Sequence, residues 1–280
     1  MPKAGIKRRA VLSGAAAIAL GLGSAMPAFA QDVQLGGTIN VSTIYRTLDP
    51  LSWDTERWSW KANHDHLQLE SLLRGDLNRG PRGTNEWAFT AADYLPYEIL
   101  QGSLAESFEV LQDPLRIEFK LRKGVYWQEV PGVMASRELV ASDIVSNFKA
   151  MHASPHATPD FWDFVERWEA KDDHTLVIYL KHYHASWDYR LTWGFYDGVA
   201  APEWHALPAE KRADWRNVTG TGPYRPTDVQ PGRLVVYTAN KNYWDKEVIN
   251  GKEYQLPLND KVVYNIIKDE SATVAAFTSG

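Results

Sequence analysis

The sequence predicts an α+β protein that contains several β-hairpins and few helices. Apolar and charged residues alternate in paired runs separated by short turns, which is the pattern of hairpin strands. A helical spacing of apolar residues occurs mainly in two stretches, so helices should be few. The chain has 280 residues and no cysteine. Disulfides and thiolate metal sites are therefore excluded, and the fold must be held together by packing.

The first thirty residues carry the three parts of an export signal. Basic residues precede an apolar run over residues 10–22, which is too short for a permanent membrane anchor. Ala28-Phe29-Ala30 then offers a small-x-small cleavage site, so the mature chain should start near Gln31. Arg8-Arg9 approximates the twin-arginine pattern, which leaves Sec and twin-arginine export both open. A buried N-terminal helix would not need the cleavage triplet.

The charge of the chain argues against nucleic acid or anionic lipid as a partner. The formal charge is −5, and removal of the four basic residues of the signal makes it −9. An acidic chain of this kind repels phosphates. No cysteine follows the apolar run, so a lipid anchor is not expected. The product should therefore be soluble and free in the periplasm.

The first strand is predicted at 38–44, where apolar and polar residues alternate. It should end before Leu48-Asp49-Pro50, because proline cannot continue strand pairing. The first helix is predicted at 141–151, where four apolar residues share one helical face. Those residues are Ile144, Val145, Phe148 and Met151. Asp143 stands in the first turn of this helix, where the dipole favours an acid.

Three hairpins are predicted from paired alternating runs joined by turn residues. They comprise 108–111 with 116–127, 165–170 with 175–180, and 224–229 with 234–239. In the first hairpin, Ile117, Phe119 and Leu121 alternate with charged residues. The turns contain Asp-Pro, Asp-Asp and Pro-Gly pairs, which favour chain reversal.

The last predicted elements are a strand at 261–267 and a helix from Glu270 to Ser279. Asp269 is expected to cap this helix. The helix is rich in apolar residues and needs a partner surface. The sequence stops at Gly280 with no closing strand, which indicates an incomplete chain.

The stretch VTGTGPYRP at 218–226 has the glycine content of a phosphate loop. A phosphate loop needs a Lys-Ser/Thr pair that opens a helix, whereas Gly222 is followed by Pro223-Tyr224 and a strand. The glycines are instead expected to turn the chain sharply and to bring its backbone close to another segment.

One ordered series of motifs consists of GTGPY, a strand, Pro231-Gly232, a second strand and the motif ANKNYW at 239–244. This series resembles the signature of family 5 extracellular solute-binding proteins. These are the peptide and nickel carriers of ABC importers. Further motifs extend the resemblance over residues 37–280, and they are Leu48-Asp49-Pro50, the segment 104–107, the segment 121–125 with the following helix, and the segment 269–280.

Two features depart from the family pattern. The segment 129–133 replaces a short Asp-Gly turn, which implies a modified loop. Val140 stands where the helix cap is usually threonine, so that cap must come from elsewhere.

The resemblance implies a type II (cluster C) periplasmic binding protein fold, of α+β or α/β class. Family members are about twice as long, as two lobes require. The chain is expected to supply the N-terminal lobe, with a mixed sheet and a hairpin-rich subdomain, and to lack the second lobe. Residues 31–75 and 205–280 should form the main part of the lobe, and 76–204 the inserted subdomain.

By resemblance, an extended ligand lies between the two lobes, which close around it. The segments 51–57 and 159–162 should face this cleft, together with the glycine bend. The expected ligand-binding residues are Trp53, Asp54, Glu56, Arg57, Phe161, Trp162, Gly222 and Tyr224. The tryptophans would stack on the ligand, and the acids would meet a cation such as a peptide amino terminus. The alternative is that both tryptophans only pack within the lobe.

The predicted function is that of a periplasmic solute-binding protein that uses no cofactor and catalyses no reaction. It should act as a monomer that captures a small solute, an oligopeptide first, and delivers it to an ABC permease and its ATPase subunits. Twelve tryptophans keep an oligosaccharide ligand open, because flat aromatic faces suit sugar rings.

Two further alternatives rest on individual residues. His64 with His66, or His182 with His184, would suit a nickel ligand set, although solvated or capping histidines explain both pairs. Glu166 with Glu169 would suit an exported glycoside hydrolase, although solvated charges in a hairpin explain them as well.

Overall fold

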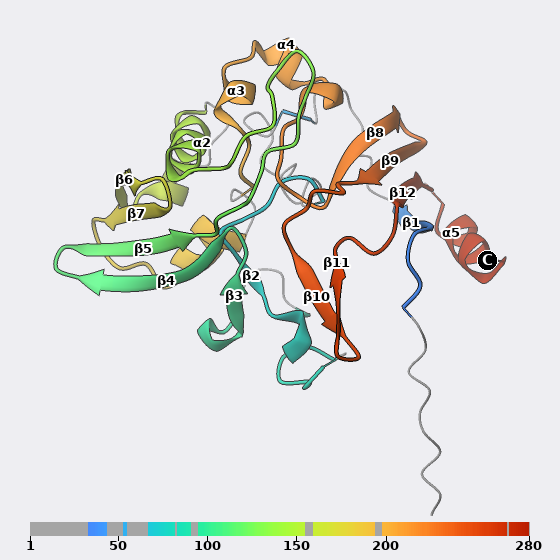
Figure 1. Cartoon of the computed structure of the whole chain (residues 1–280), viewed down its shortest axis with the longest axis horizontal. Coiled ribbons are helices and arrows are strands. Elements are labelled where there is room, and N and C mark those ends of the chain that lie inside the picture. The colour runs from blue at the N-terminus through green and yellow to red at the C-terminus, as the bar shows by residue number, and fades with distance from the viewer. Residues whose placement is uncertain are drawn as a thin grey trace, which may run out of the picture. The chain divides into compact units, whose positions relative to one another are not determined.

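The computed structural model describes residues 33–43, 53–54, 67–81, 83–90, 95–154, 159–193, 198–267 and 269–279 (Figure 1). The export signal, the Leu48-Asp49-Pro50 motif, His64 and His66 lie outside the described residues, as do Glu56 and Arg57. Among the residues that are described, no helix is long and apolar enough to cross a membrane.

Four strands form the sheet that we call the β1 sheet, in the order β1-β12-β9-β8. These strands are β1 (Thr38–Thr43), β8 (Tyr224–Gln230), β9 (Leu234–Ala239) and β12 (Lys261–Ile266). β1 and β12 are parallel, and β9 is antiparallel to both β12 and β8. The predicted strand at 38–44, the third hairpin and the strand at 261–267 are confirmed by this sheet.

Four further strands form the hairpin sheet, in the order β4-β5-β7-β6, with the long β4–β5 hairpin visible in Figure 1. They are β4 (Ala105–Gln112), β5 (Leu115–Leu121), β6 (Val165–Asp172) and β7 (Thr175–Leu180). Both predicted hairpins are confirmed, but β5 ends at Leu121 and not at Trp127. Gly124 in this segment has a φ of 74°, which turns the chain away from the sheet.

Helix α2 (Ala141–Ala153) covers one face of the hairpin sheet and packs against β6 and β7. Its four predicted apolar residues are buried, together with Ile117, Phe119 and Leu121 of β5. Val140 offers no side-chain acceptor to the helix. Instead, Asp143 Oδ2 accepts the Val140 N–H at 3.1 Å, so the first turn supplies the cap that the sequence left open.

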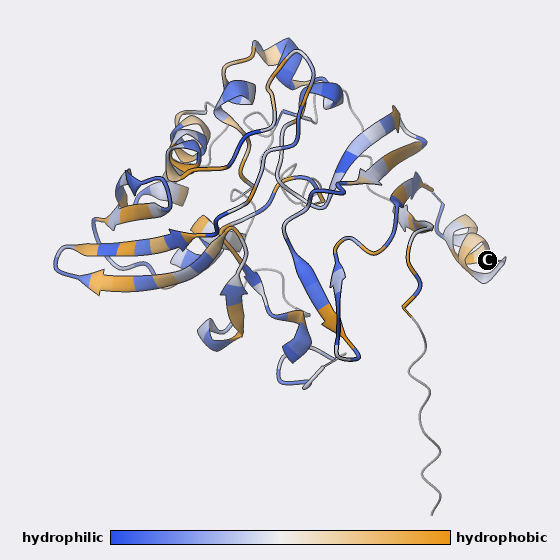
Figure 2. Cartoon of the chain, viewed as in Figure 1, coloured by the Kyte–Doolittle hydropathy of each residue, from blue (hydrophilic) through white to orange (hydrophobic). Residues whose placement is uncertain are grey.

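Helix α5 (Glu270–Ser279) begins where predicted, because Asp269 Oδ1 accepts the Ala272 N–H at 2.8 Å. None of its residues is buried, and Phe277 is 88% exposed. Figure 2 shows hydrophobic residues along the ribbon of α5 at the C-terminal end of the chain. The described residues therefore do not supply the partner surface that the apolar sequence requires.

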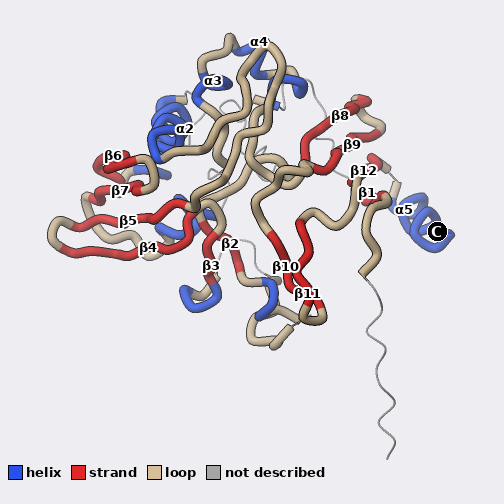
Figure 3. Tube along the Cα trace, viewed as in Figure 1, coloured by secondary structure: helices blue, strands red, loops and turns tan. Residues whose placement is uncertain are grey.

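Several short elements were not predicted, and Figure 3 shows them between the two sheets and around them. Two are strand pairs, β2 (Leu73–Gly75) with β3 (Leu100–Gly102) and β10 (Lys246–Ile249) with β11 (Lys252–Gln255). The short helices are η2 (Leu77–Arg79), η3 (Tyr97–Ile99), η4 (Pro159–Trp162), η5 (Tyr189–Trp193), α3 (Pro202–His205), α4 (Ala209–Arg212) and η6 (Trp215–Asn217). Elements of three to five residues carry too few positions for a periodic signal.

Two hydrophobic cores hold the described chain. The larger core lies between the hairpin sheet and α2 and includes Leu72 and Leu73. The smaller core lies on the β1 sheet and includes Trp53, Leu69 and Tyr224. The division of the lobe at 75/76 and 204/205 remains a prediction.

Candidate functional site

One edge of the β1 sheet collects the carboxyl ends of three strands. β1 is parallel to β12, and β8 runs in the same direction because both β8 and β12 are antiparallel to β9. In open α/β sheets, ligands bind in the crevice outside the carboxyl ends of the strands. This edge is therefore where the fold favours a binding site.

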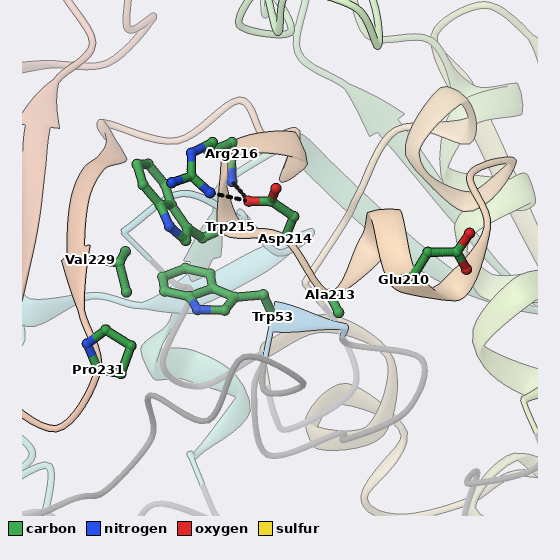
Figure 4. A pocket seen from close by; sticks show the side chains of 8 residues that line it. All are labelled: Trp53, Glu210, Ala213, Asp214, Trp215, Arg216, Val229 and Pro231. Carbon is green, nitrogen blue, oxygen red and sulfur yellow. Dashed lines mark hydrogen bonds and ion pairs between the residues drawn. The ribbon is translucent and has the colours of Figure 1, made fainter.

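A pocket of about 390 Å³ opens at the end of β8 on this edge (Figure 4). Val229 is the second-last residue of β8, and Pro231 belongs to the hairpin turn that follows. The described residues that line it are Trp53, Glu210, Ala213, Asp214, Trp215, Arg216, Val229 and Pro231. A volume of this size lies within the range of small-molecule sites.

The wall of the pocket holds a positively charged group over an aromatic ring. The Arg216 guanidinium carbon lies 4.6 Å from the centre of the Trp215 ring. Asp214 Oδ1 accepts both the Arg216 backbone N–H at 3.0 Å and Arg216 Nη1 at 3.1 Å. Asp214 therefore caps η6 and orients Arg216, as Figure 4 shows, and the Arg216 side chain is 66% exposed. Such a wall can offer ring surface and charge-assisted hydrogen bonds to a solute.

Trp53 forms the floor of the pocket, but it is only 1% exposed and belongs to the smaller core. Its ring therefore presents little surface for stacking. Asp54 is buried next to it and its Oδ2 lies 3.3 Å from Arg212 Nε. Arg212 in turn donates to the Leu207 carbonyl oxygen at 2.8 Å. The carboxylate of Asp54 is thus engaged inside the lobe, and a role for it towards a ligand stays a prediction.

The glycine bend lies at the opposite end of β8 from the pocket. Gly222 donates its N–H to the Gln68 carbonyl oxygen at 2.9 Å. A Cβ at position 220 would lie 2.1 Å from that oxygen, and one at position 222 would lie 2.6 Å from it. The prediction that these glycines bring two backbones together is confirmed. Neither glycine has a positive φ, so close approach is the reason for glycine at these positions.

Tyr224 opens β8 on the side of the bend. Its hydroxyl donates to Asn259 Oδ1 at 2.6 Å, beside the start of β12. Burial raises the pKa of Tyr224, so the phenol stays neutral at physiological pH. Gly222 and Tyr224 therefore lie away from the pocket that Trp53 lines.

Phe161 and Trp162 lie in a third place, on the larger core. Trp162 is 2% exposed and its ring meets that of Phe148 edge to face, with 5.6 Å between centroids. The Arg190 guanidinium carbon lies 5.0 Å from the centre of the Phe161 ring. This geometry supports the packing alternative for Trp162, and the ligand-facing role of both residues stays a prediction.

Trp215 and Arg216 were not predicted as site residues. Their sequence signal is the group Asp214-Trp215-Arg216, an acid, an aromatic and a base directly before the glycine stretch. An aromatic residue next to a basic one is common on protein surfaces, so this pattern alone does not predict a binding site. It becomes a candidate only because the fold places it beside the end of β8.

Two residues of the histidine and carboxylate alternatives, His184 and Glu166, make ordinary structural contacts. His184 Nδ1 accepts the Ser186 N–H at 3.1 Å, which is a capping contact, and burial lowers its pKa. Glu166 pairs with Arg167 at 2.6 Å on an exposed strand. Within the described ranges, no three His, Asp or Glu side chains are grouped so that they could hold a metal ion.

Residues 100–280 match the family described as bacterial extracellular solute-binding proteins, family 5 Middle. The di/tripeptide-binding protein 2 of Pseudomonas aeruginosa (strain UCBPP-PA14) is 31% identical over 157 residues, which are 51% of this chain and 30% of that protein. The chain spans about a third of the length of the curated relatives it matches.

Two solved structures share the fold. The binding protein MoaA of A. tumefaciens R10, in complex with mannopinic acid, gives a TM-score of 0.65 at 20% identity and covers 89% of this chain and 44% of its own. The ABC transporter-associated periplasmic binding protein DppA of Helicobacter pylori, in complex with the peptide STSA, gives 0.61 at 18% identity and covers 88% and 46%. The predicted type II periplasmic binding protein fold is confirmed.

Proposed function

Because the chain belongs to family 5 of the bacterial extracellular solute-binding proteins, we propose that it is part of the solute-binding component of an ABC importer. The protein acts in the periplasm, where it captures a peptide-like solute between two lobes and delivers it to a permease and its ATPase subunits. It makes and breaks no bond in the solute. The family match over residues 100–280 is the observation that carries this proposal.

The described lobe offers the solute the carboxyl edge of the β1 sheet. Trp215 gives ring surface, and Arg216 gives guanidinium donors that Asp214 holds in place. Trp53 lines the same pocket. Glu56 and Arg57 follow Trp53 and Asp54 in the sequence and lie outside the described residues, and we retain them as candidate ligand contacts.

A short peptide is the solute class that this wall suits best. A carboxylate can accept two hydrogen bonds from one guanidinium, and an apolar side chain can lie on an indole ring. The named function of the 31% identical relative, di/tripeptide binding, points to the same class.

Isothermal titration of the full chain, by which we mean the whole two-lobed protein, against a panel of defined di- and tripeptides, with mannopinic acid as a non-peptide comparison, tests the proposal. We expect at least one peptide to bind with a micromolar or lower dissociation constant, and small-angle scattering to show compaction on binding. A chain that binds no member of the panel and keeps an unchanged scattering profile would contradict the proposal.

A matched pair of arginine variants tests the site. Arg216→Ala should weaken peptide binding about tenfold, because hydrogen bonds to a charged group contribute about 1.5–3 kcal/mol. Arg167→Ala removes a similarly exposed arginine from the hairpin sheet and should leave binding unchanged. Equal peptide affinities of the two variants would show that the solute does not bind at the pocket beside Trp215.

A further inference from the structure

Glu70 lies at the junction of the two hydrophobic cores. Its neighbour Leu69 belongs to the smaller core, and Leu72 and Leu73 belong to the larger one. The Glu70 side chain is buried, with 6% of the residue exposed. A carboxyl group in such a place is costly unless hydrogen bonds compensate its burial.

Three side chains far away in sequence donate to this carboxyl group. Thr221 Oγ1 lies 2.8 Å from Glu70 Oε2, and the Tyr243 hydroxyl lies 2.9 Å from Oε1. Trp244 Nε1 lies 3.1 Å from Oε1 and 3.0 Å from Oε2. An indole N–H can only donate, so the site requires an acceptor at position 70. Both oxygens are satisfied, and the three contacts join the segment at 70 to the glycine bend and to the segment 243–244.

The charged groups around Glu70 are paired with other partners. Arg74 forms an ion pair with Asp245 at 2.9 Å, and the Arg122 guanidinium carbon lies 4.2 Å from the centre of the Trp244 ring. In the part of the chain that is described, no cation lies within ion-pair distance of the Glu70 carboxyl group. Burial raises the pKa of Glu70, and the hydrogen bonds from Thr221, Trp244 and Tyr243 oppose that rise.

The segment held by Glu70 leads directly to the proposed solute wall. η6, with Trp215 and Arg216, is followed by Val218, whose carbonyl oxygen accepts Gln68 Nε2 at 2.7 Å. Further along, Thr219 Oγ1 accepts the Ala201 N–H at 3.1 Å and the Gly220 carbonyl oxygen accepts the Gln128 N–H at 3.1 Å. Thr221, which is 1% exposed, then donates to Glu70. Within the described residues, Thr221 is the contact through which Glu70 reaches the segment that carries Trp215.

We infer that Glu70 is a positioning residue for the solute site, which acts through Thr221 to hold the segment 215–221 and with it the ring of Trp215 and the guanidinium of Arg216. This inference rests on the proposed function. Glu70 does not touch the pocket, so its effect on binding depends on the hydroxyl of Thr221. The Tyr243 hydroxyl donates to Oε1, and Trp244 Nε1 reaches both oxygens. Neither residue belongs to the segment 215–221 that leads to the pocket.

Thr221→Val and Tyr243→Phe form the test, because each removes one hydroxyl donor to Glu70 with little change in shape. Both variants should lose similar stability. In titrations of the full chain with the tightest-binding member of the di- and tripeptide panel, Thr221→Val should weaken binding about fivefold, and Tyr243→Phe should leave it unchanged. Equal effects of the two variants on affinity, including no effect of either, would overturn the inference while the proposed function stands.

Two substitutions at position 70 add a second readout. Glu70→Gln keeps an acceptor for Trp244 and should bind the same peptide within about twofold of the wild type, whereas Glu70→Leu should lose about tenfold. Comparable affinity for Glu70→Leu and the wild type would overturn the inference. Absence of binding by the wild type would overturn the proposed function and this inference with it.

Discussion

The hairpin sheet and the β1 sheet are both four-stranded, yet they use their apolar residues in different ways. In the hairpin sheet, the inward side chains of β5 and β7 are sealed beneath α2. In the β1 sheet, three strands end at an edge that holds a pocket, and the helix that follows β12 has no buried residue. The first arrangement is typical of a scaffold, and the second leaves surface for a ligand or for further chain.

This contrast predicts that substitutions in the two regions differ in their effect on the free energy of unfolding. Substitutions in the hairpin sheet should lower the free energy of unfolding, because each buried side chain there has neighbours on every side. Equivalent substitutions on α5 should change little, because the described residues give it no packing partner. The following pairs place the same residue type in the two regions.

Two phenylalanines should show the largest difference. Phe119 is 0% exposed and meets the rings of Phe108 and Trp187, whereas Phe277 is 88% exposed. Phe119→Ala should lower the free energy of unfolding by about 4 kcal/mol, as for other buried aromatics. Phe277→Ala should change it by less than about 0.5 kcal/mol. Denaturant titration of both variants measures the difference, and similar losses would show that α5 packs as tightly as the hairpin sheet.

Two aspartates that serve helix starts should show the next largest difference. Asp143 accepts Trp127 Nε1 at 3.0 Å and Arg137 Nη1 at 2.7 Å as well as the Val140 N–H. Asp143→Ala should therefore destabilise the protein by about 3 kcal/mol, because a buried charged network loses its centre.

Asp269→Ala should change the global unfolding free energy by less than about 0.5 kcal/mol, although it frays α5 locally. Hydrogen exchange of the α5 amides together with a thermal melt separates the local effect from the global one. A large drop in melting temperature for Asp269→Ala would contradict the separation of the two regions.

Two glycines distinguish steric contact from backbone strain. Gly220→Ala should cost about 2 kcal/mol, because the new methyl group meets the Gln68 carbonyl oxygen. Gly132 has a φ of 81° and open space around it, so Gly132→Ala should cost about 1 kcal/mol from left-handed backbone alone. Chemical denaturation gives both values. A larger loss of stability for Gly132→Ala than for Gly220→Ala would mean that the glycine bend can move away from Gln68 at little cost.

The smallest effect concerns pH at the junction of the two cores. Burial raises the pKa of Glu70 in the folded state above its value of about 4.5 in the unfolded chain. The folded state therefore binds the proton first, and the wild type should gain stability relative to Glu70→Gln as the pH falls from 7 towards 4.5. Melting temperatures across this range test the sign. A difference that stays constant, or that favours the variant in acid, would contradict it.

The sequence predicted most of the regular elements because their periodic patterns are long enough to read. The strands around Phe119 and the helix at Ile144 follow directly from alternation and helical spacing. The end of β5 at Leu121 was missed, because Val125 and Trp127 continue the apolar pattern after the chain has left the sheet.

The pocket at Trp215 was not predicted from the sequence, since residues close in sequence or in motif need not be close in space, and the ligand-binding residues that were named stay a prediction. Trp53 and Gly222 were expected on one wall, but β8 separates the pocket from the glycine bend. Trp162 carried the same aromatic signal as Trp215, and only tertiary packing distinguishes the buried ring from the one on the pocket. Parallel pairing of β1 with β12, which defines the edge, joins segments more than 200 residues apart.

Hydrogen–deuterium exchange of the full chain, with and without the tightest-binding peptide of the panel, tests the central claim most directly. We expect slower exchange at 213–217 and 229–231, on the carboxyl edge of the β1 sheet, and unchanged exchange over 105–121 in the hairpin sheet. Protection confined to the hairpin sheet, or no protection of the described lobe in a complex that forms, would contradict the claim that this edge holds the solute.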